Sequence, residues 1–365
     1  MKSFGIDLDD YVCCMAKLLV LHDWKAGASD LGDKLYGMNK PTTRQKLILD
    51  RFFEEKAVGV AIVEPDGELT VEKLVALDVH SQEYLHFLEN CYTSYESAPD
   101  TEMLREGGIV PFNFSRRKPY QSYTDVLLWR QIGYWCDDVI TPIYKDTFAK
   151  ALGAANICYS AGNYLDKYQY IYCLTGTPGH HAMRDGYGGY CYLNNAVICA
   201  KKLKGKKIAL LDLDYHHGNG TQDISWNDPS FLSVSIHADP RYDYPSYSGF
   251  ESENGPFRNN YNLIFEKEAK LDQYLVSLKK ALGVIVSYGP DVLIVPFGAD
   301  TLSSDPDASK LYRCGLLVDD FKIIGGVITD MFKGKIVITQ EGGYDLANVP
   351  TAAYNFAMGV AKAFS

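Results

Sequence analysis

From about residue 168 onward, short runs of apolar residues alternate with longer stretches of helical periodicity. The apolar runs are Tyr170–Leu174, Ile208–Leu213, Leu232–Ile236, Val292–Pro296 and Ile336–Thr339. Runs that are apolar on both faces are typical of strands buried in a parallel sheet. The stretches with the apolar stripe of crossover helices are Asn194–Leu203, Glu268–Ser287 and Asp319–Phe332. The pattern therefore predicts an α/β fold with a central, mostly parallel sheet and helices on both faces.

The first quarter of the chain has a mostly helical pattern over residues 1–95, clearest at Thr43–Glu55 and Ser81–Tyr92. A long polar segment without periodicity follows at residues 97–123. A loop of that length in a compact fold is usually functional or part of an interface. No Gly/Ser-rich or Pro-rich linker separates two cores, so we expect residues 1–365 to form a single domain.

The net charge narrows the choice of partners. The chain carries 36 Lys and Arg against 46 Asp and Glu, a formal charge of −10. This balance disfavours nucleic acid and favours neutral or cationic ligands. The nine cysteines are odd in number and lack CxxC spacing, which indicates reduced thiols and a cytoplasmic location. The apolar stretch Tyr11–Leu21 contains Lys17 and is too short to span a bilayer, so we expect no signal peptide and no membrane contact.

Polar and ionisable residues gather where the predicted strands end. In parallel sheets the ligand crevice lies beyond the carboxyl ends of the strands. Four such ends carry the groups Pro178-Gly179-His180-His181, Asp212-Leu213-Asp214-Tyr215-His216-His217, Gly298-Ala299-Asp300 and Glu341-Gly342-Gly343-Tyr344. We therefore expect the active site at this edge of the sheet.

A metal site is the first hypothesis for these groups. In extended backbone, Asp214 and His216 project to one side and can chelate one ion. Asp300, from a neighbouring strand end, would complete an Asp–His–Asp set. Three protein ligands with an open position are the pattern of a catalytic zinc. The alternative is that the Asp-x-His sequence only caps the next helix.

Proton transfer and carbonyl activation have their own candidates. Beside a metal, a neutral imidazole of the His180-His181 pair can take a proton from water and return it to a leaving amine. Asp212 and Asn219 are available to fix the tautomers. Tyr344 carries a phenol that stays protonated and can donate to a developing oxyanion. The alternative for the histidine pair is two structural loop residues.

Taken in order, these residues resemble the histone deacetylase superfamily, above all the bacterial acetylpolyamine amidohydrolases and the class II deacetylases. The similarity is specific over about residues 130–360. It includes Pro178-Gly179-His180-His181-Ala182, Tyr187-Gly188-Gly189-Tyr190-Cys191, Asp214-Tyr215-His216-His217-Gly218-Asn219-Gly220-Thr221-Gln222, Ser235-Ile236-His237, Ala238-Asp239-Pro240, Gly298-Ala299-Asp300-Thr301 and Glu341-Gly342-Gly343-Tyr344. The resemblance implies the arginase/deacetylase-like α/β fold and a metal-dependent deacetylase.

The resemblance also implies roles for single residues. It assigns the zinc ligands to Asp214, His216 and Asp300, with ferrous iron as the alternative metal in cells. It makes His181 the general base and acid, His180 its electrostatic partner and Tyr344 the carbonyl-polarising phenol. Asp212 matches the carboxylate that supports His180, and Asn219 stands where class I enzymes carry an aspartate. A structural potassium ion is implied at Asp212, Asp214, His216, Ser235 and Ile236, and tunnel walls at Gly189, Tyr190 and Tyr244.

The substrate depends on one departure from the common pattern. Many relatives have an apolar residue at the tunnel mouth where this chain has Asp307, and the class IIb polyamine deacetylase has an acidic gatekeeper there. A carboxylate at this position would attract the distal ammonium of an acetylated polyamine. Glu102 and Glu106 of the long loop could face the same cation. The alternative for Asp307 is a solvated residue that starts a helix at 305–309.

Other functions are weighed against the polyamine deacetylase. A protein lysine deacetylase would act on acetyl-lysine peptides with the same chemistry. An arginase-type dinuclear manganese hydrolase needs further carboxylates, where this chain has Gly218 and Leu302. A non-catalytic module that binds acetylated ligands would not need the full set of His and Tyr residues. In polyamine amidohydrolases an insertion comparable to residues 97–123 forms a dimer and narrows the tunnel, so the resemblance leaves two roles open for residues 97–123, a homodimer contact or a tunnel-rim insertion.

Overall fold

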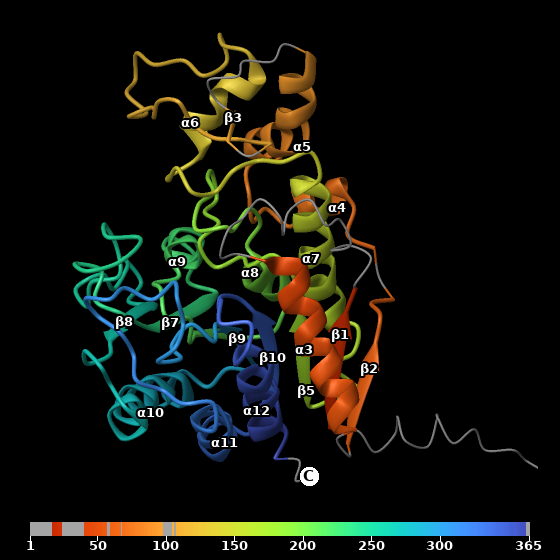
Figure 1. The fold of residues 1–365 in the computed structure, drawn as a ribbon, viewed down its shortest axis with the longest axis vertical. Helices are drawn as coiled ribbons and strands as arrows, with labels where there is room; N and C mark the ends of the chain where they lie inside the picture. The colour runs from red at the N-terminus through yellow and green to blue at the C-terminus, as the bar shows by residue number, and fades with distance from the viewer. Residues whose placement is uncertain are drawn as a thin grey trace, which may run out of the picture.

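The fold is built on one eight-stranded sheet, seen in a computed structural model that describes residues 17–23, 40–56, 59–66, 68–97, 104–105 and 107–362. The strand order is β2-β1-β5-β10-β9-β6-β7-β8 and each pairing is parallel. The strands are β1 (Leu18–His22), β2 (Val60–Val63), β5 (Tyr170–Leu174), β6 (Ile208–Asp212), β7 (Phe231–His237), β8 (Asn260–Ile264), β9 (Val292–Phe297) and β10 (Lys335–Gln340) (Figure 1).

Helices follow most of the strands, as crossover connections between parallel strands require. They are α3 (Pro41–Glu55), α4 (Val71–Ala76), α5 (Gln82–Ser97), α6 (Ile132–Trp135), α7 (Thr147–Ala161), α8 (Asn195–Lys202), α9 (Asn219–Ser225), α10 (Leu271–Tyr288), α11 (Asp320–Met331) and α12 (Val349–Ala361). Within the described residues, none of these helices is long and apolar enough to cross a membrane.

Helices cover both faces of the sheet, and the side-chain alternation of β5 shows how. Tyr170, Tyr172 and Leu174 pack in a core with residues of α3, α10, α11 and α12. Ile171 and Cys173 point the other way, into a second core with residues of α5, α7 and α8. A strand that is buried on both sides needs apolar residues at every position, which β5 has. The predicted α/β fold is confirmed.

The five strands predicted from the sequence are all present, with ends shifted by at most one or two residues. The three predicted crossover helices correspond to α8, α10 and α11. Three further strands, β1, β2 and β8, were not predicted. In β8 asparagines alternate with apolar residues, and the apolar run of β2 is only four residues long and half-buried. The mostly helical prediction for residues 1–95 is wrong where β1 and β2 extend the sheet.

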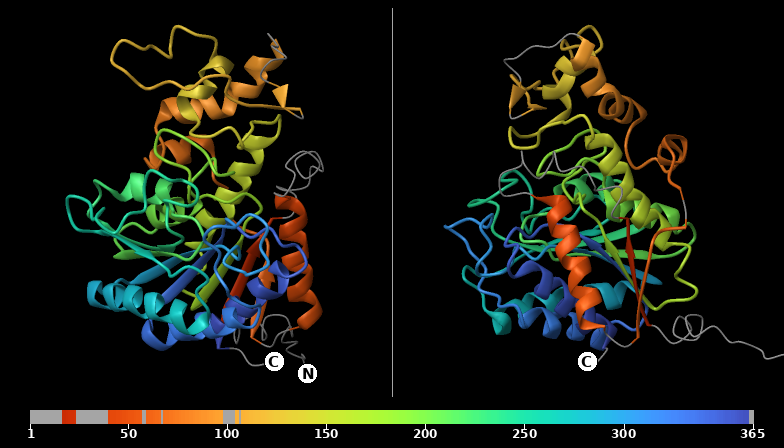
Figure 2. Two further views of the ribbon diagram at one scale, coloured as in Figure 1. Left: turned by 60° about the vertical axis from the view of Figure 1, so that its left-hand side comes forward. Right: turned by 45° about the vertical axis from the view of Figure 1, so that its right-hand side comes forward.

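The described chain between α5 and α7 lies at one end of the molecule, away from α10 and α11 (Figure 2). It contains the described part of the predicted long loop, in which two-residue strands β3 (Leu104–Arg105) and β4 (Gly108–Ile109) pair antiparallel. The rest of that loop is irregular, and its Phe112 and Tyr120 side chains are exposed. Glu102 and Glu106 lie outside the described residues, as do Cys13 and Cys14.

Candidate active site

Three predicted ligands converge beyond the carboxyl ends of two neighbouring strands. Asp214 and His216 follow β6, and Asp300 follows β9, which pairs with β6. Each offers one ligand atom, and these atoms all lie within 4.8 Å of one another. His216 Nδ1 is 3.4 Å from Asp214 Oδ1 and 3.4 Å from Asp300 Oδ2. All three side chains are buried, so the arrangement can hold one ion out of bulk water.

The backbone that carries the first two ligands differs from the extended strand expected from the sequence. β6 ends at Asp212, and the main chain then turns. The Asp214 N–H donates to Asp212 Oδ1 at 3.1 Å, and the His216 N–H donates to Asp214 Oδ1 at 2.9 Å. Aspartate favours such local turns because its short carboxylate reaches the N–H two residues on. The two side chains still meet, but the turns bring them together rather than strand alternation.

The donor set fits a divalent cation. Asp300 Oδ1 accepts a hydrogen bond from the Tyr215 N–H at 2.9 Å, whereas its buried Oδ2 accepts none among the described residues. Burial and the nearby charge of Asp214 raise the pKa of Asp300 well above its ordinary value. A buried carboxylate oxygen without a hydrogen bond, next to a second carboxylate, is costly unless a cation compensates it. Carboxylate oxygen and imidazole nitrogen are common zinc ligands.

The two tandem histidines occupy the centre of a tight turn beside this group. The Ala182 N–H donates to the Gly179 carbonyl at 3.0 Å and closes the turn. His180 Nδ1 lies 3.0 Å from Asp212 Oδ2, and the two imidazole rings are 3.9 Å apart. Burial lowers the pKa of His180, but the carboxylates of Asp214 and Asp212 outweigh burial and raise it to about 10. His180 therefore contributes positive charge.

His181 has the opposite electrostatic setting. Its Nδ1 donates to the side-chain oxygen Oδ1 of Asn219 at 2.6 Å, and Asn219 is the first residue of α9. This bond fixes the tautomer and leaves Nε2 as a proton acceptor. Burial and the positive charges of His180 and His216 lower the pKa of His181 well below its ordinary value. A neutral imidazole with a free Nε2 can act as a base.

Tyr344 is carried by a short segment after β10. Its N–H donates to Asp305 Oδ2 at 2.7 Å, and Arg44 Nη1 donates to the Gly343 carbonyl at 3.1 Å. Gly343 has φ of 115°, a conformation that suits glycine alone. Burial and the charge of Asp307 raise the pKa of Tyr344 well above its ordinary value. The phenol is therefore a hydrogen-bond donor. The buried Arg44 was missed because a single arginine in a helical pattern is unremarkable in sequence.

The residues predicted to form the tunnel walls lie close to His181 and Tyr344. Tyr244 lies edge-on to His181 with ring centroids 4.8 Å apart, and Tyr190 lies edge-on to Tyr344 at 5.9 Å. At Gly189, which has φ of 53°, a Cβ would come 2.2 Å from His181 Cδ2. Asp138 Oδ2 accepts hydrogen bonds from the Gly189 N–H at 2.7 Å and the Tyr244 hydroxyl at 3.3 Å. Asp138 thus ties the two walls together, and no sequence motif marked it.

Asp307 lies in irregular chain, so the alternative of a helix beginning at 305–309 is wrong. Its N–H donates to Asp305 Oδ1 at 3.0 Å. Burial raises the pKa of Asp307. The positive charge of His216 lowers this pKa, and the negative charge of Asp243 raises it further. Asp243 was not predicted: its Oδ1 is 3.9 Å from His216 Nε2, and its Oδ2 accepts from the Ser309 N–H at 2.9 Å. The Asp243 carboxylate therefore faces the imidazole of a predicted ligand, and the charge of Asp307 acts on the same group.

Of the residues assigned to potassium, Asp212, Ser235 and Ile236 lie on the adjacent strands β6 and β7, and Asp214 and His216 follow β6. Asp212 at the end of β6 pairs in register with Ser235 of β7, and Ile236 follows it. The Ser235 hydroxyl lies 2.8 Å from His237 Nδ1. The rings of His217 and His237 are tilted to each other, with centroids 4.6 Å apart. Burial lowers the pKa of both of these histidines, so they are neutral core residues.

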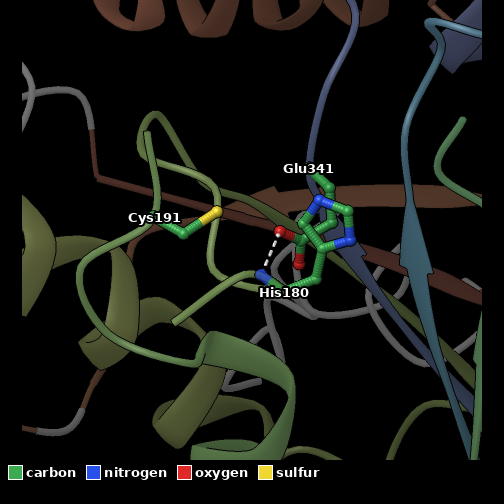
Figure 3. Close-up of side chains that lie close together, drawn as sticks. All are labelled: His180, Cys191 and Glu341. Atoms are coloured by element: carbon green, nitrogen blue, oxygen red, sulfur yellow. Dashed lines mark hydrogen bonds between the residues drawn. The ribbon is translucent and has the colours of Figure 1, made fainter. Parts of the chain in front are cut away.

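A second cluster with metal-ligating side chains consists of His180, Cys191 and Glu341 (Figure 3). Glu341 Oε2 accepts from the Gly179 N–H at 2.6 Å and the His180 N–H at 3.1 Å. Its Oε1 accepts from the Thr339 hydroxyl at 2.9 Å. Burial raises the pKa of the Cys191 thiol well above its ordinary value, so the thiol is neutral. Hydrogen bonds already satisfy the carboxylate, and this cluster is better described as structural.

His80 anchors the segment between the tandem histidines and α8. Its Nδ1 donates to the Met183 carbonyl at 2.7 Å, and its Nε2 accepts from the Asn194 N–H at 2.9 Å. The ring is fully buried, and burial lowers its pKa from 6.5 to about 4.

Because the folded protein keeps His80 neutral, the unfolded chain binds more protons between pH 6.5 and 4. Stability should therefore fall as the pH drops through this window, by about 3 kcal/mol for this group. Urea unfolding at several pH values measures the slope. Since other histidines add slopes of their own, the test is the difference from His80→Gln. Equal slopes for the two proteins would contradict the prediction.

Comparisons with known proteins identify a family model, sequence relatives and a solved structure that are similar to this chain. A family model described as "Histone deacetylase domain" matches residues 39–360. Acetylpolyamine amidohydrolase 2 of Pseudomonas aeruginosa is 32% identical over 327 residues, covering 88% of this chain and 90% of the relative. Acetylpolyamine amidohydrolase of Mycoplana ramosa is 32% identical over 293 residues, covering 78% and 82%. The crystal structure of acetylpolyamine aminohydrolase from Burkholderia pseudomallei superposes with a TM-score of 0.82 at 27% identity, covering 94% and 98%.

Proposed function

The chain belongs to the histone deacetylase family, and we propose that it removes the acetyl group from N-acetylated polyamines. One observation carries the proposal. A neutral base, a phenol and a buried Asp–His–Asp set, brought together from distant parts of the chain, meet at one edge of the sheet. These are the groups that hydrolysis of an unactivated amide requires. The relatives that match most of the chain are acetylpolyamine amidohydrolases.

Asp214, His216 and Asp300 would hold the catalytic metal, zinc or, in cells, ferrous iron. When bound, such a metal supplies positive charge to the amide carbonyl and activates a water molecule. The unpartnered Asp300 Oδ2 supports this assignment. A structural potassium ion is proposed at Asp212, Asp214, His216, Ser235 and Ile236, supported by the pairing of Asp212 with Ser235 in the sheet.

The protein residues divide the proton chemistry between them. His181 Nε2 accepts the proton of the attacking water, because Asn219 holds Nδ1 as the donor. Tyr344 donates to the carbonyl oxygen as negative charge develops on it, which stabilises the tetrahedral oxyanion. His181 then gives its proton to the departing amine, and acetate and a free amine result. His180 stays in place beside Asp212 and holds positive charge near the oxyanion.

The choice of a cationic amine is supported by local charge. Asp243 Oδ1 lies 3.9 Å from Nε2 of the predicted ligand His216, the charges of Asp307 and His216 interact, and the whole chain carries a net charge of −10. Carboxylates beside a tunnel favour an ammonium group over a neutral chain end. The seven described cysteines that are free thiols are all buried, which supports a reducing compartment such as the cytoplasm.

The alternatives are supported less well. A protein lysine deacetylase would use the same residues, but the full-length relatives above carry polyamine names. An arginase-type second metal has no support, since the only other ligand cluster found among the described residues is the hydrogen-bonded one around Glu341. A module that only binds acetylated ligands would not need His181 as a base or Tyr344 as a donor.

The substrate is tested by comparing kcat/KM for N-acetylputrescine, N-acetylcadaverine, N8-acetylspermidine and an acetyl-lysine peptide. We expect the polyamines to be preferred. Asp307→Asn, which keeps the shape and removes the charge, should lower kcat/KM for the polyamines by roughly 10-fold or more and leave the peptide almost unchanged.

Asp272→Asn on the exposed start of α10 removes the same charge far from the site and serves as the control. A peptide that is hydrolysed faster than every polyamine, with an Asp307→Asn variant of unchanged selectivity, would establish the lysine deacetylase instead.

A further inference from the structure

The turn that carries both catalytic histidines is held by main-chain hydrogen bonds on every side. The Gly179 carbonyl accepts from Ala182, and the His180 carbonyl accepts from the Thr221 N–H at 3.1 Å. The Ala182 carbonyl accepts from Asn194 Nδ2 at 3.1 Å. The N–H groups of Gly179 and His180 both point to the same side. In a buried turn, unpaired N–H groups would be costly.

A single carboxylate oxygen satisfies both of these N–H groups. Glu341 Oε2 accepts from Gly179 at 2.6 Å and from His180 at 3.1 Å, and the second of these bonds is drawn in Figure 3. The other oxygen of Glu341 is fixed by the Thr339 hydroxyl. Glu341 is completely buried, so water has no access to replace it. Loss of these two hydrogen bonds would therefore leave two buried N–H groups without an acceptor.

Glu341 also belongs to the segment that carries the other catalytic groups. The next residue, Gly342, donates its N–H to Asp214 Oδ2 at 2.8 Å. Tyr344 follows two residues later. The Glu341 N–H itself donates to the Phe297 carbonyl at the end of β9, the strand that precedes Asp300. Through this one segment, the position of the histidine turn is coupled to the metal ligands and to the phenol.

We propose that Glu341 is a positioning residue that holds the His180-His181 turn in register with the metal group and Tyr344. The role rests on the proposed deacetylase function, because it acts through His181. Burial raises the pKa of Glu341 to about 7. This agrees with a role in which the side chain serves chiefly as a hydrogen-bond acceptor, whatever its charge at neutral pH.

Three substitutions of Glu341 distinguish a role of its hydrogen bonds in positioning the turn from a role of its negative charge. Glu341→Gln keeps an oxygen that can accept from both N–H groups and an amide that can donate to Thr339 Oγ. Glu341→Asp keeps the charge but is one methylene too short to reach both groups. Glu341→Ala removes the acceptor. We expect kcat to stay within about 3-fold of wild type for glutamine, and to fall about 10- to 100-fold for aspartate and alanine, with KM and metal content unchanged.

Ile338→Ala is the control for general loss of stability, since Ile338 is a fully buried core residue of β10, the strand that directly precedes Glu341. It should lower the melting temperature while kcat stays close to wild type. If alanine and aspartate at position 341 retain wild-type kcat, the proposal is overturned. It is equally overturned if glutamine is as slow as alanine, because the charge would then be what matters.

A readout without turnover keeps the two proposals apart. In protein labelled with ¹⁵N-histidine, the His181 ring signal should be unchanged in Glu341→Gln and shifted in Glu341→Asp. A folded wild-type protein that hydrolyses no acetyl amide would defeat the proposed function, whatever the ring signals show. An active wild type whose His181 signal is the same in all variants would defeat the role of Glu341 alone.

Discussion

Replacing Asp300 by asparagine is expected to weaken divalent-metal binding by two orders of magnitude or more and to abolish amide hydrolysis. Asparagine retains the oxygen that accepts from the Tyr215 N–H, so the loop keeps its local hydrogen bond. It replaces the unpartnered Oδ2 by an amide nitrogen, which carries no charge and is not a zinc ligand. Equilibrium dialysis with Zn²⁺, followed by elemental analysis, measures the loss directly.

Asp305→Asn is the matched control for this experiment. Asp305 is also a buried aspartate, five residues along, but its oxygens accept from the N–H groups of Tyr344, Asp345 and Asp307 rather than facing the ligand group. Its variant should bind zinc with nearly wild-type affinity. An Asp300→Asn protein that retains stoichiometric, tightly bound zinc would refute the assignment of the ligands.

Tyr344→Phe is expected to lower kcat by about 10²- to 10³-fold while metal content stays constant. The change removes one oxygen atom and leaves the ring, which lies 5.9 Å from the Tyr190 ring and 5.6 Å from Arg44 Cζ. Because the phenol donates only to an oxygen that becomes negative during the reaction, the loss should fall on kcat rather than KM. Steady-state kinetics with an acetylated diamine and metal analysis of the same sample provide the test.

Tyr354→Phe supplies the comparison for Tyr344→Phe. The Tyr354 hydroxyl in α12 is buried and has no hydrogen-bond partner among the described residues. Its removal should leave kcat at the wild-type value. Equal turnover for the Tyr344→Phe and Tyr354→Phe proteins would mean that the oxyanion finds its donor elsewhere.

The parts of the fold that were predictable from the sequence are those with a continuous apolar signal. The strands β5 and β9 are buried on both faces, so each residue in them is apolar and their limits can be read along the chain. β8 lies at the edge of the sheet, where asparagines serve as hydrogen-bonding residues for the loop beside it. Its pattern does not resemble that of a strand buried on both faces, because two of its five residues are only half-buried.

For the site, the residues with distinctive chemistry at strand ends were predictable and their supports were not. Asp214, His216 and Asp300 stand out as ionisable groups after apolar runs, and they do meet. Asp138 contacts Gly189, and Asp243 contacts His216, each far away in the sequence. The residues next to Asp138 and Asp243 in the chain do not indicate these partners. Glu341 was visible as part of a motif, but its role depends on a turn that lies 161 residues away in the chain.

The strand made last, β10, occupies an inner place of the sheet, with β5 on one side and β9 on the other. A nascent chain that has left the ribosome only as far as α11 therefore has two separate half-sheets, β2-β1-β5 and β9-β6-β7-β8, each with an open edge. Such edges are prone to pair with other chains. The need for chaperone protection therefore lasts until β10 emerges, and the segment that carries Glu341 and Tyr344 emerges directly after it.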